Sequence, residues 1–383
     1  MKFHIFIFIV LCGCSTQYNK SSSNELATQK SKYTVEYTTE NHIMAWRDSV
    51  VETIKGRDFE VIDGIPVYLT RNKRNGDIIG YNFQTTEKVF KVKRSNLPNE
   101  AEYGQFNSIY IHNFDCIFIV QDYMIKLIDT SGIIKQQLVI NNEADKLYKT
   151  HAIGNLNYAP IFFDAKNNKL YIESYCWKCK RHKPSYYKSK IEVAIDLASG
   201  KTELLPQTYP ILYQENYYGY ANHTYREAND SLNVYSFPVD PNIYLYNRLS
   251  GNYKTVGGKS KYQKQLANTL SRKQKDDEKT KIEHFSIIPF YYKVHYNPFQ
   301  NYYYRFFSPG LSQKNEEGLF NKNSDREHIL MIFDEQFKLI DEIKLEEKYQ
   351  VFFTFCTPEG LYVNRVNEKK EKGLYTIFKI NIQ

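Results

Sequence analysis

Two aromatic clusters have the residue types and spacing to bind a ligand: Tyr217-Tyr-Gly-Tyr220 and Tyr302-Tyr-Tyr-Arg-Phe-Phe307. Aromatic rings stack on the apolar faces of pyranose sugars, and protein interfaces favour Tyr and Arg. The competing interpretation is strand packing, because alternate residues of a strand face opposite ways and one set faces the core. On the binding interpretation, the candidate residues are Tyr218, Tyr220, Tyr303 and Arg305.

The segment Cys176-Trp-Lys-Cys179 is a C-x-x-C motif with three possible chemistries. A redox pair needs a helix directly after the motif to lower the thiol pKa, and the following Lys-Arg-His-Lys-Pro cannot start one cleanly. A zinc site with His182 as a third ligand lacks a second C-x-x-C. The remaining interpretation is a pair of loop cysteines, bonded or reduced. Cys116 and Cys356 lie in apolar runs and are expected to be buried in strands.

Known catalytic and cofactor motifs are missing from the sequence. It contains no H-E-x-x-H, G-x-S-x-G or G-x-G-x-x-G. Val256-Gly-Gly-Lys-Ser260 resembles the end of a P-loop, but Tyr253 stands where the first glycine would be. The histidines are scattered, and a lone histidine is usually structural. His151, His223 and His295 could meet in a central channel, but nothing in the sequence indicates that they do. We therefore expect no catalytic residue, no metal and no cofactor.

The most specific signal is at the N-terminus. Lys2 precedes the apolar run Phe3–Leu11, which is too short to span a membrane and is typical of a signal peptide. Leu11-Cys-Gly-Cys14 resembles a bacterial lipobox, so cleavage after Gly13 would leave Cys14 as a lipid-modified first residue. Several acyl chains would form a firm membrane anchor. The competing interpretation is a short apolar strand with two incidental cysteines.

The residues after Cys14 predict where the anchor lies. Ser15, rather than Asp, follows the cysteine, which favours the outer membrane by resemblance to enterobacterial lipoproteins. Residues 15–24 contain no acid, which favours the periplasmic face over the cell surface. We predict a signal peptide at residues 1–13, a polar flexible tether at 14–32 and a folded domain at 33–383.

Composition favours a soluble β-rich domain. The 383 residues include 34 Tyr and 24 Phe, and aromatic residues favour strands. The formal charge of +8 is spread over several basic stretches without a nucleic-acid-binding motif, so no nucleic-acid partner is expected. The basic stretches are interpreted as solvated loops or helix faces.

A recurring strand that ends in Asp or Asn and a tight turn divides the chain into units. The marks fall 47 to 87 residues apart, and the shorter steps match a propeller blade. The fold class is therefore predicted as all-β, a β-propeller of six blades with one helical insertion, predicted over Lys261–Lys281. A β-sandwich would also give short strands but not this recurrence. The marks are Asn82, Asp129, Asp196, Asn247, Asp334 and Asn381.

The lipobox, the tether and the stretches Ile243–Gly251 and Ser260–Tyr262 resemble an uncharacterised family of Bacteroidetes lipoproteins. That resemblance implies a six-bladed, TolB-like β-propeller and no assigned catalytic residues. The expected function is a non-catalytic, lipid-anchored module that binds a protein or glycan in the cell envelope. The alternative is a propeller enzyme, a polysaccharide lyase or glycosidase, with carboxylates or a His–metal set gathered at the central channel.

Overall fold

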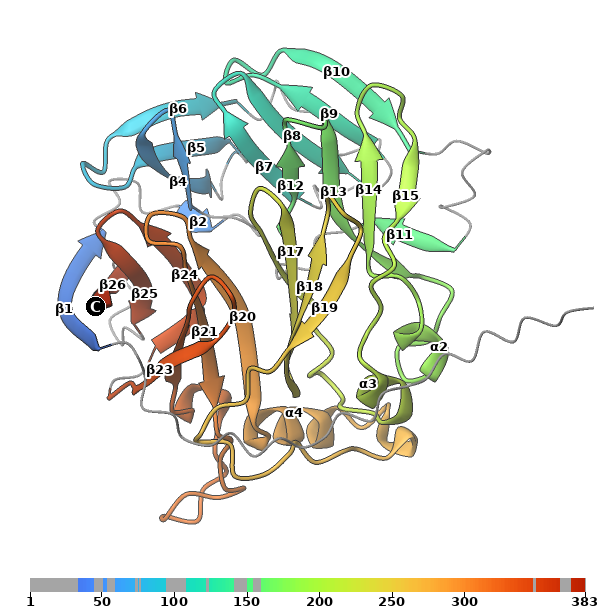
Figure 1. The fold of residues 1–383 in the computed structure, drawn as a ribbon, viewed down its shortest axis with the longest axis vertical. Helices are drawn as coiled ribbons and strands as arrows, with labels where there is room; N and C mark the ends of the chain where they lie inside the picture. Colours follow the sequence, from blue (N-terminus) through green and yellow to red (C-terminus); the bar gives the residue numbers. More distant parts are fainter. Residues whose placement is uncertain are drawn as a thin grey trace, which may run out of the picture. The chain divides into compact units, whose positions relative to one another are not determined.

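The computed structural model describes residues 34–44, 51–53, 59–72, 75, 77–93, 108–121, 124–140, 150–153, 160–346, 349–365 and 373–382. These residues form six small antiparallel sheets in a ring, a six-bladed β-propeller (Figure 1). The predicted fold class is confirmed. The predicted signal peptide and tether, with Cys14, lie outside the described residues. No helix of the described residues is long and apolar enough to cross a membrane.

The first three blades follow one another along the chain. Blade one contains β2 (Val51–Thr53), β3 (Phe59–Ile62), β4 (Ile65–Asn72), β5 (Ile78–Asn82) and β6 (Lys88–Val92). Blade two contains β7 (Ser108–Asn113), β8 (Cys116–Gln121), β9 (Met124–Ile128) and β10 (Ile134–Val139). Blade three contains β11 (His151–Ile153), β12 (Phe162–Asp164), β13 (Lys169–Cys176), β14 (Glu192–Asp196) and β15 (Thr202–Leu204).

The last three blades complete the ring, and the helices lie in connections of blades three to five. Blade four contains β16 (Tyr225–Ala228), β17 (Leu232–Phe237), β18 (Asp240–Asn247) and β19 (Tyr253–Val256). Blade five contains β20 (Phe290–Asn297), β21 (Tyr302–Ser308), β22 (Ile329–Phe333) and β23 (Leu339–Lys344). Blade six contains β24 (Tyr349–Thr357), β25 (Gly360–Arg365), β26 (Gly373–Ile382) and β1 (Val35–Met44). The helices are α2 (Pro184–Tyr187), α3 (Ile211–Glu215), η3 (Arg272–Gln274), α4 (Glu278–Ile287) and η4 (Asn323–Asp325).

The ring is closed by strands from opposite ends of the chain. β1 precedes blade one in sequence but pairs antiparallel with the C-terminal β26 along its whole length, from Val35 opposite Ile382 to Met44 opposite Gly373. Blade six therefore has strands from both ends. This pairing joins the first part of the chain to the last. It also covers the edge of β26, whose backbone N–H and C=O groups would otherwise be unpaired.

The first strands of the blades face one another around the axis of the ring. β16 contacts β20, β20 contacts β24, and β3 contacts β7. Later strands lie progressively further from the axis. Side chains on the first strands are therefore the ones that line the central channel.

The recurring Asp and Asn marks lie at the same place in each blade. Five of them follow or end the third strand, and each accepts hydrogen bonds through Oδ1 from backbone N–H groups two to four residues later. Such turns are a common use of Asp and Asn side chains. The sixth mark, Asn381, lies in β26, the third strand of blade six, where it pairs with Glu36. The marks therefore count the blades correctly.

The predicted helix bounds were wrong. Residue Leu270 forms an isolated bridge with Tyr217 and donates its N–H to that residue's carbonyl at 2.7 Å, so the backbone there is extended. Leu266 is 71% exposed rather than packed on an apolar face. The helix α4 instead begins after Asp277, whose Oδ1 accepts a hydrogen bond from the N–H of Thr280 at 3.0 Å. The N-cap of α4 therefore comes from the acidic run Asp276-Asp-Glu278.

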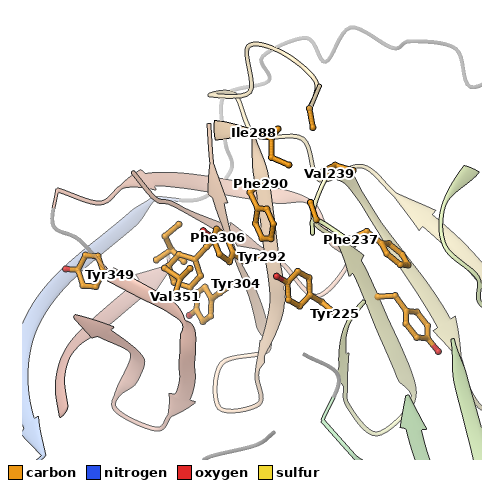
Figure 2. Packing of buried hydrophobic residues seen from close by; sticks show 14 of the residues in the cluster. Tyr225, Phe237, Val239, Ile288, Phe290, Tyr292, Tyr304, Phe306, Tyr349 and Val351 are labelled. Carbon is orange, nitrogen blue, oxygen red and sulfur yellow. The ribbon is translucent and has the colours of Figure 1, made fainter. Parts of the chain in front are cut away.

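Aromatic packing between blades builds the largest part of the core. Phe290 and Tyr292 of β20 belong to one cluster with Phe306 of β21 and Val351 of β24 (Figure 2). Tyr225 and Phe237 extend the same cluster into blade four. The high Tyr and Phe content is therefore used mainly to fill the wedge-shaped spaces between neighbouring sheets.

The turn bonds of Asp334 should contribute measurably to stability. The side chain is 6% exposed and accepts from the N–H groups of Gln336 at 3.0 Å and Lys338 at 2.7 Å. We expect Asp334→Ala to lower the free energy of unfolding by about 1–2 kcal/mol, because two backbone donors lose their acceptor. Asp334→Asn keeps Oδ1 and should cost less than about half of that. Urea unfolding measures both, and equal losses for the two variants would contradict this role.

Candidate functional site

A cavity of about 360 Å³ lies where the first strands of several blades converge. Its walls come from β3 of blade one, β16 of blade four, β20 of blade five and β24 of blade six, with Pro160 just before β12 of blade three. The cavity therefore lies in the central channel, where side chains from separate blades meet. No single segment of the chain could form it.

Chain direction places the cavity at one end of the channel. The strand β20 starts at Phe290, just after α4, and ends at Asn297. Pro298 and Phe299, in the turn after this strand, line the cavity. The cavity is thus at the end of β20 that is remote from α4.

The polar part of the cavity is an ion pair between two blades. Lys293 Nζ on β20 lies 3.0 Å from Glu227 Oε2 on β16, and both side chains are mostly buried. The other carboxylate oxygen of Glu227 accepts the N–H of Ala228 at 3.0 Å. The two opposite charges offset each other, so this part of the cavity offers both a donor and an acceptor with little net charge.

His295 lies two residues beyond Lys293 and lines the same cavity. It is 5% exposed, and its Nε2 has no hydrogen-bond partner. Burial, with a smaller contribution from Lys293, lowers the pKa of His295 to about 3, although Glu227 opposes the shift. The imidazole is therefore neutral near pH 7 and leaves a buried nitrogen able to bond to a ligand.

The remaining walls are largely aromatic. Phe59 of blade one stacks on Phe355 of blade six with ring centroids 4.3 Å apart. Three apolar side chains of the lining are also well exposed to solvent: Phe299 at 43%, Phe352 at 37% and Val61 at 36%. Exposed aromatic rings beside a cavity are available to stack on a ligand.

The cavity contains few reactive groups. Burial raises the pKa of the Cys356 thiol far above its usual range, with Glu227 adding to the shift, so this thiol stays protonated and is a poor nucleophile. Glu60, on β3, is a second carboxylate in the lining. Within the described part of the chain, no three His, Cys, Asp or Glu side chains are grouped to hold a metal ion.

The structure separates the four aromatic-cluster candidates from this cavity. Tyr218 is 6% exposed and its ring packs 5.3 Å from that of Tyr213. Tyr220 is 38% exposed, bonds to Glu278 of α4 and lies under the ammonium group of Lys281. Both residues belong to the connection between blades three and four.

Tyr303 and Arg305 lie inside blade five. Tyr303 is 2% exposed and stacks on Phe337 with centroids 4.2 Å apart. Arg305 is fully buried and donates to the carbonyls of Pro241 at 2.6 Å and Asp240 at 3.0 Å. Burial lowers the pKa of Arg305 to about 10. These contacts join blade five to blade four and favour the packing interpretation.

The cavity residues had a weak signal in the sequence. Lys293 and His295 alternate with apolar residues in Phe290–Asn297, which indicates a strand with one polar face. Glu227 lies in a strand of only four residues, and its partner is 66 positions away in sequence. The pairing could not be found from spacing.

The C-x-x-C motif forms a disulfide between Cys176 and Cys179. This agrees with the interpretation as bonded loop cysteines. Cys116 and Cys356 are free and lie on β8 and β24 as predicted, but both residues are half-buried rather than fully buried.

Comparisons with known proteins identify a family but no activity. A family model described as "Domain of unknown function (DUF4221)" matches residues 98–344. A solved structure of a DUF4221 family member from Bacteroides vulgatus is similar over 91% of this chain and 98% of its own, with a TM-score of 0.72 and 18% identity. A luciferin-regenerating enzyme is similar over 89% of this chain and 95% of its own, with a TM-score of 0.45 and 9% identity. No curated protein matches the sequence.

The buried His295 predicts acid sensitivity. Below pH 6.5 the unfolded chain binds a proton at this histidine, whereas the folded chain does so only near pH 3. The unfolded state therefore binds more protons, and the free energy of unfolding falls as the pH falls through this range. We expect His295→Gln to flatten the decline by about 1 kcal/mol per pH unit between pH 6 and 4.

Urea unfolding at several pH values measures the slope. His328, whose pKa burial lowers to about 4, lies outside the cavity lining and gives a matched variant, His328→Gln, with a similar flattening. A His295→Gln slope parallel to that of the unsubstituted protein would contradict the assignment of a neutral, buried imidazole.

Proposed function

This chain belongs to the DUF4221 family, and we propose that it is a lipid-anchored binding protein of the cell envelope that holds a neutral sugar unit in its central cavity. The observation that carries the proposal is the channel cavity, with aromatic walls and the Glu227–Lys293 pair beside the unpartnered His295 Nε2.

The size of the cavity favours a small ligand or the end of a chain over a flat protein surface. Ligand pockets are typically about 300–1,000 Å³, and this cavity of about 360 Å³ is near the lower end of that range. A flat protein partner would instead use a broad surface patch. A glycan can place one terminal unit in such a space while the rest remains in solvent.

The charges favour a neutral, hydroxyl-bearing ligand. Glu227 and Lys293 are paired, and His295 is neutral near pH 7. Glu60 adds a second carboxylate to the lining, which disfavours an anionic ligand. Sugar hydroxyls can accept from Lys293 and donate to Glu227 or His295. Phe299 and Phe352 supply rings for the apolar face of the sugar.

Binding is favoured over catalysis because Glu227, one of the two carboxylates in the lining with Glu60, is already paired. A glycosidase needs two carboxyl groups placed on either side of the scissile bond. Glu227 is bonded to Lys293 and to a backbone N–H. The propeller enzyme remains an alternative that the binding experiment below would reveal through product formation.

The proposed location rests on the N-terminal sequence. The lipobox-like Leu11-Cys-Gly-Cys14 supports lipid attachment at Cys14, and Ser15 supports the outer membrane with the domain facing the periplasm. The polar residues after Cys14 would serve as the tether between the lipid and the domain.

Sugar binding should depend on the exposed ring at the cavity. We expect calorimetry on a panel of neutral mono- and disaccharides to find at least one that binds. Uronic acids and amino sugars should not compete with it for the cavity. Phe299→Ala should weaken its binding by up to about tenfold, because a stacking contact with one aromatic ring contributes about 0.5–1.5 kcal/mol. Glu227→Gln with Lys293→Met should weaken it further.

The matched control is Phe320→Ala, which removes another exposed phenyl ring, 50% exposed, outside the cavity lining. It should leave sugar binding unchanged. Equal losses for Phe299→Ala and Phe320→Ala, or no binding of any neutral sugar, would contradict the proposal. New reducing ends or unsaturated products in the same mixtures would favour the enzyme.

Lipid attachment is tested by labelling cells with radioactive palmitate. The unsubstituted chain should carry the label and partition into detergent, whereas Cys14→Ala should carry none because the acyl acceptor is gone. Cys12→Ser is the control, since Cys12 lies before the predicted cleavage site. Label retained on Cys14→Ala would rule out this anchor.

A further inference from the structure

Four long connections lie together on one side of blades three to five. They are residues 177–191, 205–224, 257–289 and 309–328, and we call them the helical face. In an up-and-down sheet, the connections from second to third strand and from one blade to the next emerge at the same end. Figure 1 shows α2, α3 and α4 gathered there. This end is opposite to the turn that carries Phe299 of the cavity.

The helical face carries the net charge of the chain. Residues 177–191 contain six Lys and Arg and no acid, and residues 257–289 contain eight against four acids. The four connections together have a net charge of +8, which equals that of the whole chain. The rest of the sequence is therefore neutral overall, and the positive potential is concentrated on this side.

The basic groups nearest the disulfide are not neutralised within the fold. The acids of α4 already pair with basic residues of their own segment, Glu278 with Lys281 and Glu283 with Lys279. Among the described residues, no carboxylate forms an ion pair with Lys178 or Arg181. These cations face solvent and can meet an external anion.

Large apolar side chains are exposed among these charges. Each is at least 50% exposed, and apolar side chains exposed among polar ones are typical of protein or membrane interaction sites where they gather in a patch. They come from all four connections. They are Trp177 at 51%, Ile211 at 59%, Leu266 at 71%, Ile282 at 57%, Leu319 at 61% and Phe320 at 50%.

The loop that presents Trp177 is held in place. The disulfide between Cys176 and Cys179 closes it on both sides of the indole. Arg272 Nε donates to the carbonyl of His182 at 3.2 Å and joins the loop to the long connection before α4. A loop ordered in advance loses less conformational freedom on binding.

We propose that the helical face docks on a membrane surface with anionic headgroups, with Trp177 entering the interface. Basic residues beside a surface attract anionic lipids, and Trp prefers the boundary between headgroups and acyl chains. A soluble polyanion would satisfy the charges but would leave these Trp, Ile, Leu and Phe side chains exposed to water. Docking on this side leaves the cavity open to solvent, and it requires no lipid at Cys14.

The test uses the full chain with Cys14→Ala, so that no attached lipid contributes. It is mixed with vesicles of phosphatidylcholine, with or without phosphatidylglycerol, and sedimented. We expect binding only with phosphatidylglycerol. Lys178→Glu with Arg181→Glu should lower the partition coefficient by at least about tenfold, since each basic residue near the surface contributes on the order of 1 kcal/mol.

The matched control reverses the charge of two exposed lysines that lie in the turns after third strands. These turns are at the other end of the blades. Lys201→Glu with Lys338→Glu makes the same change in total charge and should alter the partition coefficient by less than about twofold. An equal loss for both double variants would show that net charge alone drives adsorption, and it would overturn the assignment of a docking face.

Fluorescence separates membrane insertion from binding to a polyanion. The chain has two Trp, so Trp46→Phe leaves Trp177 as the reporter. Its emission should shift to the blue with anionic vesicles and be quenched by brominated acyl chains, and Trp177→Ala should weaken binding several-fold. Unchanged emission on bound vesicles, or binding to heparin without binding to vesicles, would overturn the proposal.

Discussion

Closure of the ring is the constraint on which the rest of the structure depends. The cavity needs the first and last blades side by side, and the ten-residue pairing of β1 with β26 places the strand that precedes blade one inside blade six. Phe59 of blade one then stacks on Phe355 of blade six, and both rings line the channel cavity. A strand from the N-terminal end of the domain therefore holds in place a wall formed by its C-terminal end. The hydrogen bonds of this long pairing join chain segments that are far apart in sequence.

Buried guanidinium groups hold neighbouring blades together in a second way. Arg226 of blade four pairs with Glu192 of blade three at 2.7 Å, and Arg305 of blade five donates to carbonyls of blade four. Each group donates to several backbone carbonyls, which satisfies the condition for burying a charge. Arg305 was a candidate for ligand binding because Arg is common at interfaces. Its five donors instead suit an internal joint between sheets.

The two ends of the blades differ in chemistry. Short turns with Asp and Asn caps form one end, where the cavity lies, and long connections with helices, which carry the net positive charge, form the other. The proposed functions follow this division, with a neutral sugar at the cavity and an anionic membrane at the helical face. The charge on the helical face was visible in the sequence as several basic stretches, each of which is unremarkable alone. Their combined effect depends on the fold, which brings four separate connections to one side.

The sequence alone determined the blade count and the turn positions, because an Asp or Asn cap and a strand of alternating residues are local features repeated in every blade. It also determined the absence of familiar catalytic motifs and the lipobox-like N-terminus. It misplaced the helix, because apolar spacing near Leu266 and Leu270 gave no information about the bridge that keeps Leu270 extended beside Tyr217. Only the tertiary structure decided which polar residues meet. Glu227, Lys293 and His295 come together because two first strands, far apart in sequence, face the same axis, and that proximity is a property of the closed ring.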